Sequence, residues 1–84
     1  MENVGLLAGI GTLPGEFLKA ARLQGYRVIC IAVIPGTNPE LKEKADVYYE
    51  ISAFKLNKII KTLVKENVKE VTLLGKVTDR KSVV

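Results

Sequence analysis

The chain has 84 residues, a single cysteine and no histidine. A chain of this length forms one domain at most and buries only about 60–65% of the surface that it exposes when unfolded, so its stability margin is thin. The composition is globular, because 48% of the residues are apolar and 26% are charged. The lack of histidine excludes a histidine-dependent catalytic triad and an imidazole general base from this chain.

The formal net charge is +4, from 13 basic and 9 acidic residues. Nucleic-acid sites typically cluster arginines among aromatic residues, whereas the basic residues here are mostly dispersed lysines. We therefore expect a mild preference for anions and no nucleic-acid partner. The longest apolar run, residues 28–34, is far too short to span a bilayer, and no basic segment follows Met1, which favours a cytoplasmic protein.

The first half of the chain predicts a strand over residues 4–8, a glycine turn and a helix over residues 14–24. Gly25 is expected to end this helix in a left-handed conformation. The β-branched run over residues 28–34 is typical of a parallel strand covered on both faces. Cys30 lies inside that run and is expected to be a buried, unreactive thiol.

The second half predicts one helical turn over residues 40–45, a strand over residues 46–51, a long helix and a last strand over residues 71–74. Ser52 is the expected N-cap of the long helix, and Asn67 its C-terminal cap. Apolar residues recur along this helix at the expected spacing: Leu56, Ile59, Ile60, Leu63 and Val64. Lysines line its other side and are interpreted as a solvated face: Lys55, Lys58, Lys61 and Lys65.

This order of elements predicts an α/β fold in which residues 1–84 form a single domain. Right-handed crossovers give a Rossmann-like, three-layer fragment with two long helices and a four-stranded, mainly parallel sheet in the order three, two, one, four. The build-up of the sheet reverses between the first and fourth strands, which is where open α/β sheets usually bind ligands. Both strands end in glycine turns, at Gly9 to Gly11 and at Gly75, so we expect the two turns to converge on one cleft.

An anion, such as a phosphate, suits that predicted cleft, because glycine lets a ligand approach the backbone and the next helix offers free N–H groups. Thr12 could add a hydroxyl donor and Lys76 a positive charge, with Thr78 and Arg80 just beyond. A dinucleotide site is an alternative. However, Pro14 stands where that fingerprint requires its third glycine, and no acidic residue follows Ile34 directly.

No catalytic residue or metal ligand is assigned in this chain. Its carboxylates show no metal-ligand spacing, and no nucleophile motif accompanies them; those weighed are Asp46, Glu50, Glu66 and Asp79. A non-enzymatic interaction module therefore stays open as a further alternative.

Several turns and runs, taken in order, resemble one known family. They are residues 6–14 (LLAGIGTLP), 24–25 (QG), the run ending at Ile34, 38–41 (NPEL), the helix over 56–63 and 71–77 (VTLLGKV). This set resembles the amino-terminal domain of bacterial UDP-2,3-diacylglucosamine pyrophosphatases of the type that joins a Rossmann-like domain to a family-specific second domain. The resemblance covers nearly the whole chain.

The resemblance implies a Mg²⁺-dependent hydrolase of lipid A biosynthesis that cleaves UDP-2,3-diacylglucosamine to UMP and 2,3-diacylglucosamine 1-phosphate. It places the lipid-linked sugar phosphate between the two domains, in contact with Gly11, Thr12, Leu13, Gly75, Lys76 and Val77. The second domain, with the acidic metal-binding and catalytic residues, is absent from this chain, so the chain alone is expected to be inactive. The sequence Asp79-Arg80-Lys81 also departs from the family, which usually has a proline after the arginine.

A fragment of this kind would expose apolar surface that the second domain normally covers. We therefore expect the isolated chain to form a homo-oligomer through its last strand or its cleft. For the parent enzyme, a cytoplasmic location with peripheral contact to the inner membrane is compatible with its lipid substrate.

Overall fold

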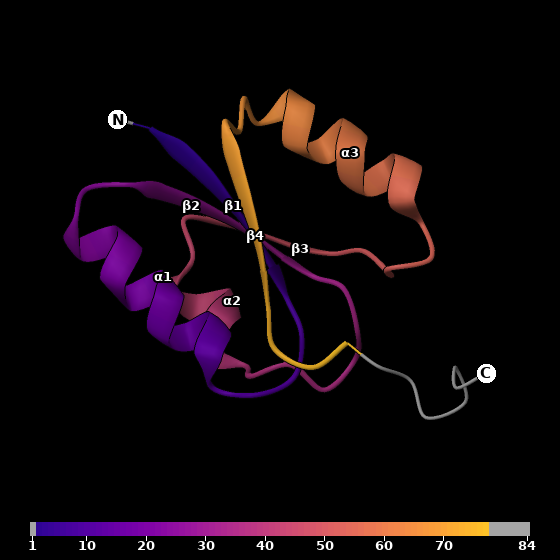
Figure 1. Cartoon of the computed structure of the whole chain (residues 1–84), viewed down its shortest axis with the longest axis horizontal. Coiled ribbons are helices and arrows are strands. Elements are labelled where there is room, and N and C mark those ends of the chain that lie inside the picture. Colours follow the sequence, from indigo (N-terminus) through magenta and orange to yellow (C-terminus); the bar gives the residue numbers. More distant parts are fainter. Residues whose placement is uncertain (1, 78–84) are drawn as a thin grey trace.

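The computed structural model describes residues 2–77, which form a three-layer α/β domain (Figure 1). In chain order the elements are β1 (Asn3–Ala8), α1 (Leu13–Leu23), β2 (Arg27–Ala32), α2 (Glu40–Lys44), β3 (Val47–Glu50), α3 (Leu56–Lys65) and β4 (Glu70–Leu74). The four strands form one sheet in the order β3-β2-β1-β4, and every neighbouring pair is parallel. The predicted fold class and strand order are confirmed.

The helices divide between the two faces of the sheet, with α1 and α2 on one face and α3 on the other (Figure 1). The core under α1 and α2 contains Val4, Leu6, Ala8, Leu18, Ala21, Val28, Cys30 and Leu41. The core under α3 contains Ile31, Val33, Ile51 and Ile59. Because β2 is central and contributes side chains to both cores, its apolar residues form an unbroken run.

Local sequence signals explain several element boundaries. Gly25 follows α1 with a φ of 90°, and Asn67 follows α3 with a φ of 61°, so both predicted helix stops are confirmed. Tyr48 packs against the core under α1 and Tyr49 against the core under α3, as the alternation of side chains along a strand requires.

Two predicted boundaries are wrong. Ser52 does not cap α3, whose N-cap is Lys55 and has no side-chain capping bond. Instead, the Ser52 hydroxyl accepts a hydrogen bond from the Phe54 N–H at 3.2 Å, and the Ser52 carbonyl accepts one from the Lys55 N–H at 2.9 Å. This separate turn delays the start of the helix. The strand β2 ends at Ala32 rather than at Ile34, because the chain turns away from the sheet before Pro35 and Gly36.

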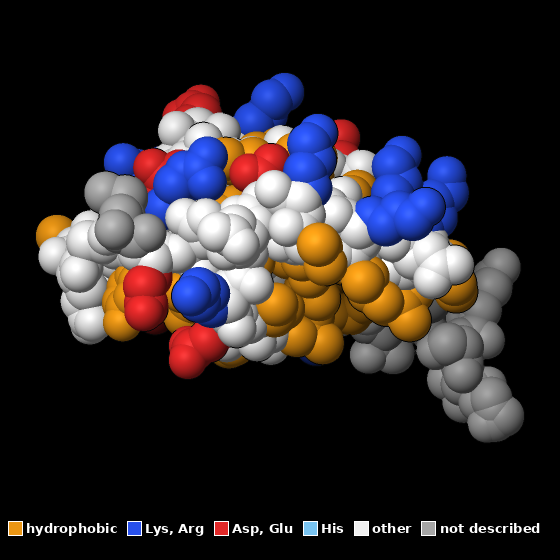
Figure 2. All heavy atoms as spheres, turned by 90° about the horizontal axis from the view of Figure 1, so that it is seen from above, with side chains coloured by type: hydrophobic (Ala, Val, Ile, Leu, Met, Phe, Trp, Pro, Cys, Tyr) orange, Lys and Arg blue, Asp and Glu red, His pale blue; other side chains and the backbone are white. Residues whose placement is uncertain are grey.

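Among residues 2–77, an apolar surface beside the edge strand β4 is left uncovered. On α3, the side chains of Leu56, Ile60 and Val64 are 49–73% exposed, and on β4 those of Val71 and Leu73 are 48% and 58% exposed. We call these five residues the α3–β4 apolar face. Figure 2, which views the molecule from the α3 side, shows a continuous hydrophobic band beside a row of basic side chains.

Within residues 2–77, no helix has the length and apolar character needed to cross a membrane.

Candidate functional site

The two glycine turns lie directly against each other at the carboxyl ends of β1 and β4. The N–H of Gly9 donates to the carbonyl oxygen of Leu74 at 2.8 Å. Ile10 and Lys76 exchange two backbone hydrogen bonds of 2.9 and 2.8 Å, which form an isolated antiparallel bridge. The turns therefore converge as predicted, but direct backbone contact stands between them where a cleft was expected.

Close packing accounts for two of the glycines. A Cβ on Gly9 would lie 2.5 Å from the carbonyl oxygen of Lys76, and one on Gly75 would lie 2.8 Å from the carbonyl carbon of Gly9. Gly75 also has a φ of 94°, a conformation that other residues rarely adopt. The close contact between the two turns is therefore a sufficient reason for both glycines, and no bound ligand is needed to explain them.

The N-terminus of α1 remains open beside these turns. Gly11 has a φ of 127° and free space around the position of a Cβ. Thr12 is the N-cap, but its hydroxyl makes no capping bond. The first helical bond runs from the Glu16 N–H to the Thr12 carbonyl at 3.1 Å, so the N–H of Leu13 precedes the helical ladder. An anion could approach this end of the helix from outside.

The predicted site residues lie in the two glycine turns and at the start of α1, and the side chain of Val77 packs against the core under α3. Gly11, Thr12, Leu13 and Lys76 are exposed, whereas Gly75 and Val77 are half-buried. The bridge between Ile10 and Lys76 brings the two groups together. Contact of these residues with a sugar phosphate stays a prediction, and Thr78 and Arg80 lie outside the described residues.

A small cavity of about 170 Å³ opens between α1 and α2. Its lining consists of Thr12, Gly15, Glu16, Leu18, Lys19, Asn38, Glu40, Leu41 and Lys44. It contains one of the predicted site residues, Thr12, and none from the turn after β4.

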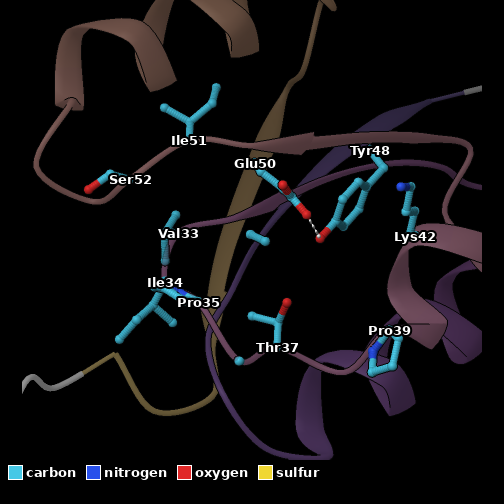
Figure 3. A pocket seen from close by; sticks show the side chains of 12 residues that line it. Val33, Ile34, Pro35, Thr37, Pro39, Lys42, Tyr48, Glu50, Ile51 and Ser52 are labelled. Atoms are coloured by element: carbon cyan, nitrogen blue, oxygen red, sulfur yellow. Dashed lines mark hydrogen bonds between the residues drawn. The ribbon is translucent and has the colours of Figure 1, made fainter.

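A larger cavity of about 520 Å³ lies at the carboxyl ends of β2 and β3 (Figure 3). Its lining consists of Ala32, Val33, Ile34, Pro35, Gly36, Thr37, Pro39, Lys42, Tyr48, Glu50, Ile51 and Ser52. This cavity was not predicted from the sequence. The sequence feature that could have indicated the cavity is the turn-forming segment after Ile34 (PGTNP). This segment carries the chain away from the sheet and leaves space beyond the ends of the strands.

Tyr48 and Glu50 form a polar pair at this larger cavity. The Tyr48 hydroxyl donates to Oε2 of Glu50 at 3.2 Å. Burial, and then the neighbouring Glu50 charge, raises the pKa of Tyr48, while a hydrogen bond with Thr37 lowers it. A phenol is protonated at neutral pH even at its ordinary pKa, so Tyr48 is a hydrogen-bond donor here.

Neither metal ligation nor thiol chemistry is built into the described part of the chain. No three His, Cys, Asp or Glu side chains gather there in a way that could hold a metal ion. Asp46 accepts a hydrogen bond from the Val28 N–H at 2.9 Å, and Glu66 accepts one from the Tyr49 hydroxyl at 2.6 Å, so both serve the fold. Burial raises the pKa of Cys30 to about 11, which agrees with the predicted unreactive thiol.

Comparison with known proteins identifies the family of the chain. A family model described as "LpxI N-terminal domain" matches residues 3–84, which is nearly the whole length. Neither the curated proteins nor the solved structures gave a match. The family acts in lipid A biosynthesis, which is the pathway that the sequence resemblance implied. The chain therefore belongs to the LpxI N-terminal domain family.

Proposed function

We propose that this chain is the substrate-binding amino-terminal domain of a Mg²⁺-dependent hydrolase that cleaves UDP-2,3-diacylglucosamine. The products are UMP and 2,3-diacylglucosamine 1-phosphate, and the domain contacts the sugar phosphate of the lipid product. Family membership over residues 3–84 is the observation that carries this proposal. The open N-terminus of α1 supports it, because free N–H groups and the positive end of a helix dipole favour a phosphate there.

Lys76 provides the positive charge of the proposed phosphate site. Its backbone is fixed to Ile10 by two hydrogen bonds, while its side chain is exposed. The Thr12 hydroxyl is not used in capping and can donate to the same anion. A phosphate bound at this place would receive a side-chain cation, a hydroxyl and backbone N–H donors together.

The hydrolytic step itself is assigned to a second domain in a cytoplasmic parent enzyme. Within residues 2–77, no three His, Cys, Asp or Glu side chains gather in a way that could hold a metal ion. In the proposal, the acidic residues that hold the metal and activate water therefore belong to the second domain. The 84-residue chain binds and does not hydrolyse.

Nuclear magnetic resonance of the isotope-labelled chain tests this binding role. Titration with 2,3-diacylglucosamine 1-phosphate should shift the amides of Gly11, Thr12 and Lys76 in a saturable way. Lys76→Ala should weaken binding about tenfold, which is the effect of losing one hydrogen bond to a charged group. Lys58→Ala, an exposed lysine on α3, is the matched control and should leave the affinity unchanged.

The opposite outcome would remove the proposal. Unchanged amides at both glycine turns, or equal losses for Lys76→Ala and Lys58→Ala, would show that the phosphate does not bind there. Saturable shifts at the same turns with NAD alone would favour a dinucleotide site instead.

We further propose that the second domain covers the α3–β4 apolar face in the whole protein, and that in the isolated chain a second copy does so. Among residues 2–77, the outer edge of β4 pairs with no other strand, and exposed apolar residues flank it on the α3 side. Leu73→Lys should therefore convert a dimer into a monomer in sedimentation experiments. Leu23→Lys, an exposed leucine on α1, is the control. If the unsubstituted 84-residue chain is a monomer at millimolar concentration, the proposed pairing of two copies is contradicted.

A further inference from the structure

The larger cavity presents two walls of different chemistry. One wall is apolar and includes Val33, Ile34, Pro35 and Ile51. The other wall carries the polar side chains of Thr37, Lys42, Tyr48 and Glu50. Figure 3 shows Thr37, Tyr48 and Glu50 directed toward one another on this polar side. The volume of about 520 Å³ lies within the range of small-molecule sites.

Glu50 has acceptor capacity that its protein contacts leave unused. Its Oε2 accepts one hydrogen bond, the 3.2 Å bond from Tyr48. Among residues 2–77, no other side chain donates to this carboxylate and no cation lies within ion-pair distance of it. An ionised carboxylate offers about four acceptor positions, so it can receive two neighbouring hydroxyl groups in addition to the phenol.

The position of Glu50 gives those free acceptors a specific meaning. In doubly wound sheets that bind nucleotides, an acidic side chain at the carboxyl end of the second strand accepts hydrogen bonds from the ribose. Here the two residues after β2, Val33 and Ile34, lead into the turn at Pro35, and the acid comes from the neighbouring strand β3. The strand register pairs Ala32 at the end of β2 with Glu50 at the end of β3. The carboxylate therefore occupies the same edge of the sheet.

Lys42 supplies a cation at the same cavity. It lies on α2 and lines the cavity, whereas the ion pair within this helix joins Lys44 to Glu40 at 3.6 Å. Within the described part of the chain, no carboxylate lies within ion-pair distance of the Lys42 ammonium. A ligand anion can therefore take that place, while a planar or apolar ring packs on the opposite wall.

We propose that this cavity binds a nucleoside 5′-phosphate, with the ribose hydroxyls donating to Glu50, the phosphate beside Lys42 and the base against Ile34 and Pro35. This site is separate from the glycine turns and extends the proposed function. Only the choice of a uridine nucleotide as the first probe rests on that function. The ligand could be a free nucleotide or the nucleotide half of a nucleotide sugar, because both carry the same ribose and phosphate.

The test is a set of titrations of the labelled 84-residue chain. UMP should shift the amides of Gly36, Thr37, Glu50 and Ser52 in a saturable way at millimolar concentrations. The analogue dUMP, which lacks the 2′-hydroxyl, should bind about tenfold more weakly, because it leaves one acceptor of the carboxylate unpaired. Equal affinity for AMP would support a general nucleoside phosphate site, and tighter binding of a uridine nucleotide sugar than of UMP would identify the nucleotide sugar as the ligand.

Two variants assign the contacts. Glu50→Gln removes the charge and one acceptor and should weaken UMP binding about tenfold, while Glu43→Gln on α2, an exposed acid outside both cavities, should leave it unchanged. Lys42→Ala should weaken UMP binding but not uridine binding, because uridine has no phosphate. Glu50 and Lys42 are both exposed, so neither substitution is expected to unfold the domain.

Three results would overturn the proposal. The first is the absence of saturable shifts with every nucleotide. The second is equal affinity for UMP and dUMP, which would remove the role of the ribose. The third is a nucleotide response confined to Gly11 and Lys76. A different result separates the two proposals. If the lipid phosphate does not shift the amides of Gly11 and Lys76 but UMP still shifts those of Gly36 and Glu50, the proposed function is contradicted and the nucleotide site is supported.

Discussion

Replacing Gly9 with alanine probes the contact between the two glycine turns. The added Cβ would lie 2.5 Å from the carbonyl oxygen of Lys76 and 2.8 Å from its carbonyl carbon. Both atoms belong to the backbone, so no side chain can move aside to make room. The turn after β4 must shift, and the shift strains the 2.8 Å bond from the Gly9 N–H to Leu74 and the 2.9 Å bond from the Ile10 N–H to Lys76.

The expected cost follows from those two effects. Overpacking a close contact costs about 1–3 kcal/mol, and each weakened hydrogen bond costs up to about 1 kcal/mol. We therefore expect Gly9→Ala to lower the free energy of unfolding by about 3 kcal/mol. A domain of 84 residues has a total of about 4–13 kcal/mol, so the loss removes a large part of the stability.

Urea unfolding followed by circular dichroism measures this loss. The matched control is Gly15→Ala, because Gly15 lies inside α1 with no atom within 4 Å of the new Cβ and its φ is not positive. Removing that helical glycine should stabilise the domain by about 0.5–1 kcal/mol. If Gly9→Ala unfolds within about 0.5 kcal/mol of the parent chain, the inferred backbone contact is refuted.

Three further predictions address the end of α3, the core and the buried thiol. Asn67→Ala should lower the free energy of unfolding by about 1 kcal/mol, because alanine at a φ of 61° has a Cβ but no polar side chain that can hydrogen-bond locally. Asn67→Gly should not lower it, and thermal unfolding compares the two variants. Leu18→Ala should lower the free energy of unfolding by about 2–5 kcal/mol, because Leu18 is 1% exposed. Leu23 is 86% exposed, so Leu23→Ala should lower it by less than about 0.5 kcal/mol. Urea unfolding measures both variants, and equal losses would contradict the core assignment. Burial raises the pKa of Cys30 from 9.0 to about 11, so the unfolded chain loses its thiol proton first and the free energy of unfolding should fall as pH rises from 9 through about 11. Cys30→Ala should reduce this fall, and an unchanged slope would count against the buried thiol.

The sequence by itself determined the architecture. The alternation of apolar runs and helical periodicity gave the order of elements, and the right-handed crossover rule then led to the observed order β3-β2-β1-β4. Helix stops at Gly25 and Asn67 were also predictable, because only a few residue types accept a positive φ. These features depend on interactions between residues close in the chain or on general chirality, and both are visible in a sequence.

The tertiary structure decided the start of α3 and the details at the carboxyl ends of the strands. Ser52 has the chemistry of an N-cap, but its hydroxyl accepts a hydrogen bond within an earlier turn, and α3 begins only after Lys55. The sequence showed that glycines follow β1 and β4. It did not show that the absence of a side chain at Gly9 and Gly75 lets the backbones of the two turns touch.

The larger cavity depends on tertiary structure most of all. Its polar side chains come from the turn after β2, from α2 and from β3, and they meet only because the register sets Glu50 beside Ala32. No spacing in the sequence encodes that register directly. It is fixed by burial of apolar side chains on both faces of β2, since a slip by one residue would exchange the two faces of the strand.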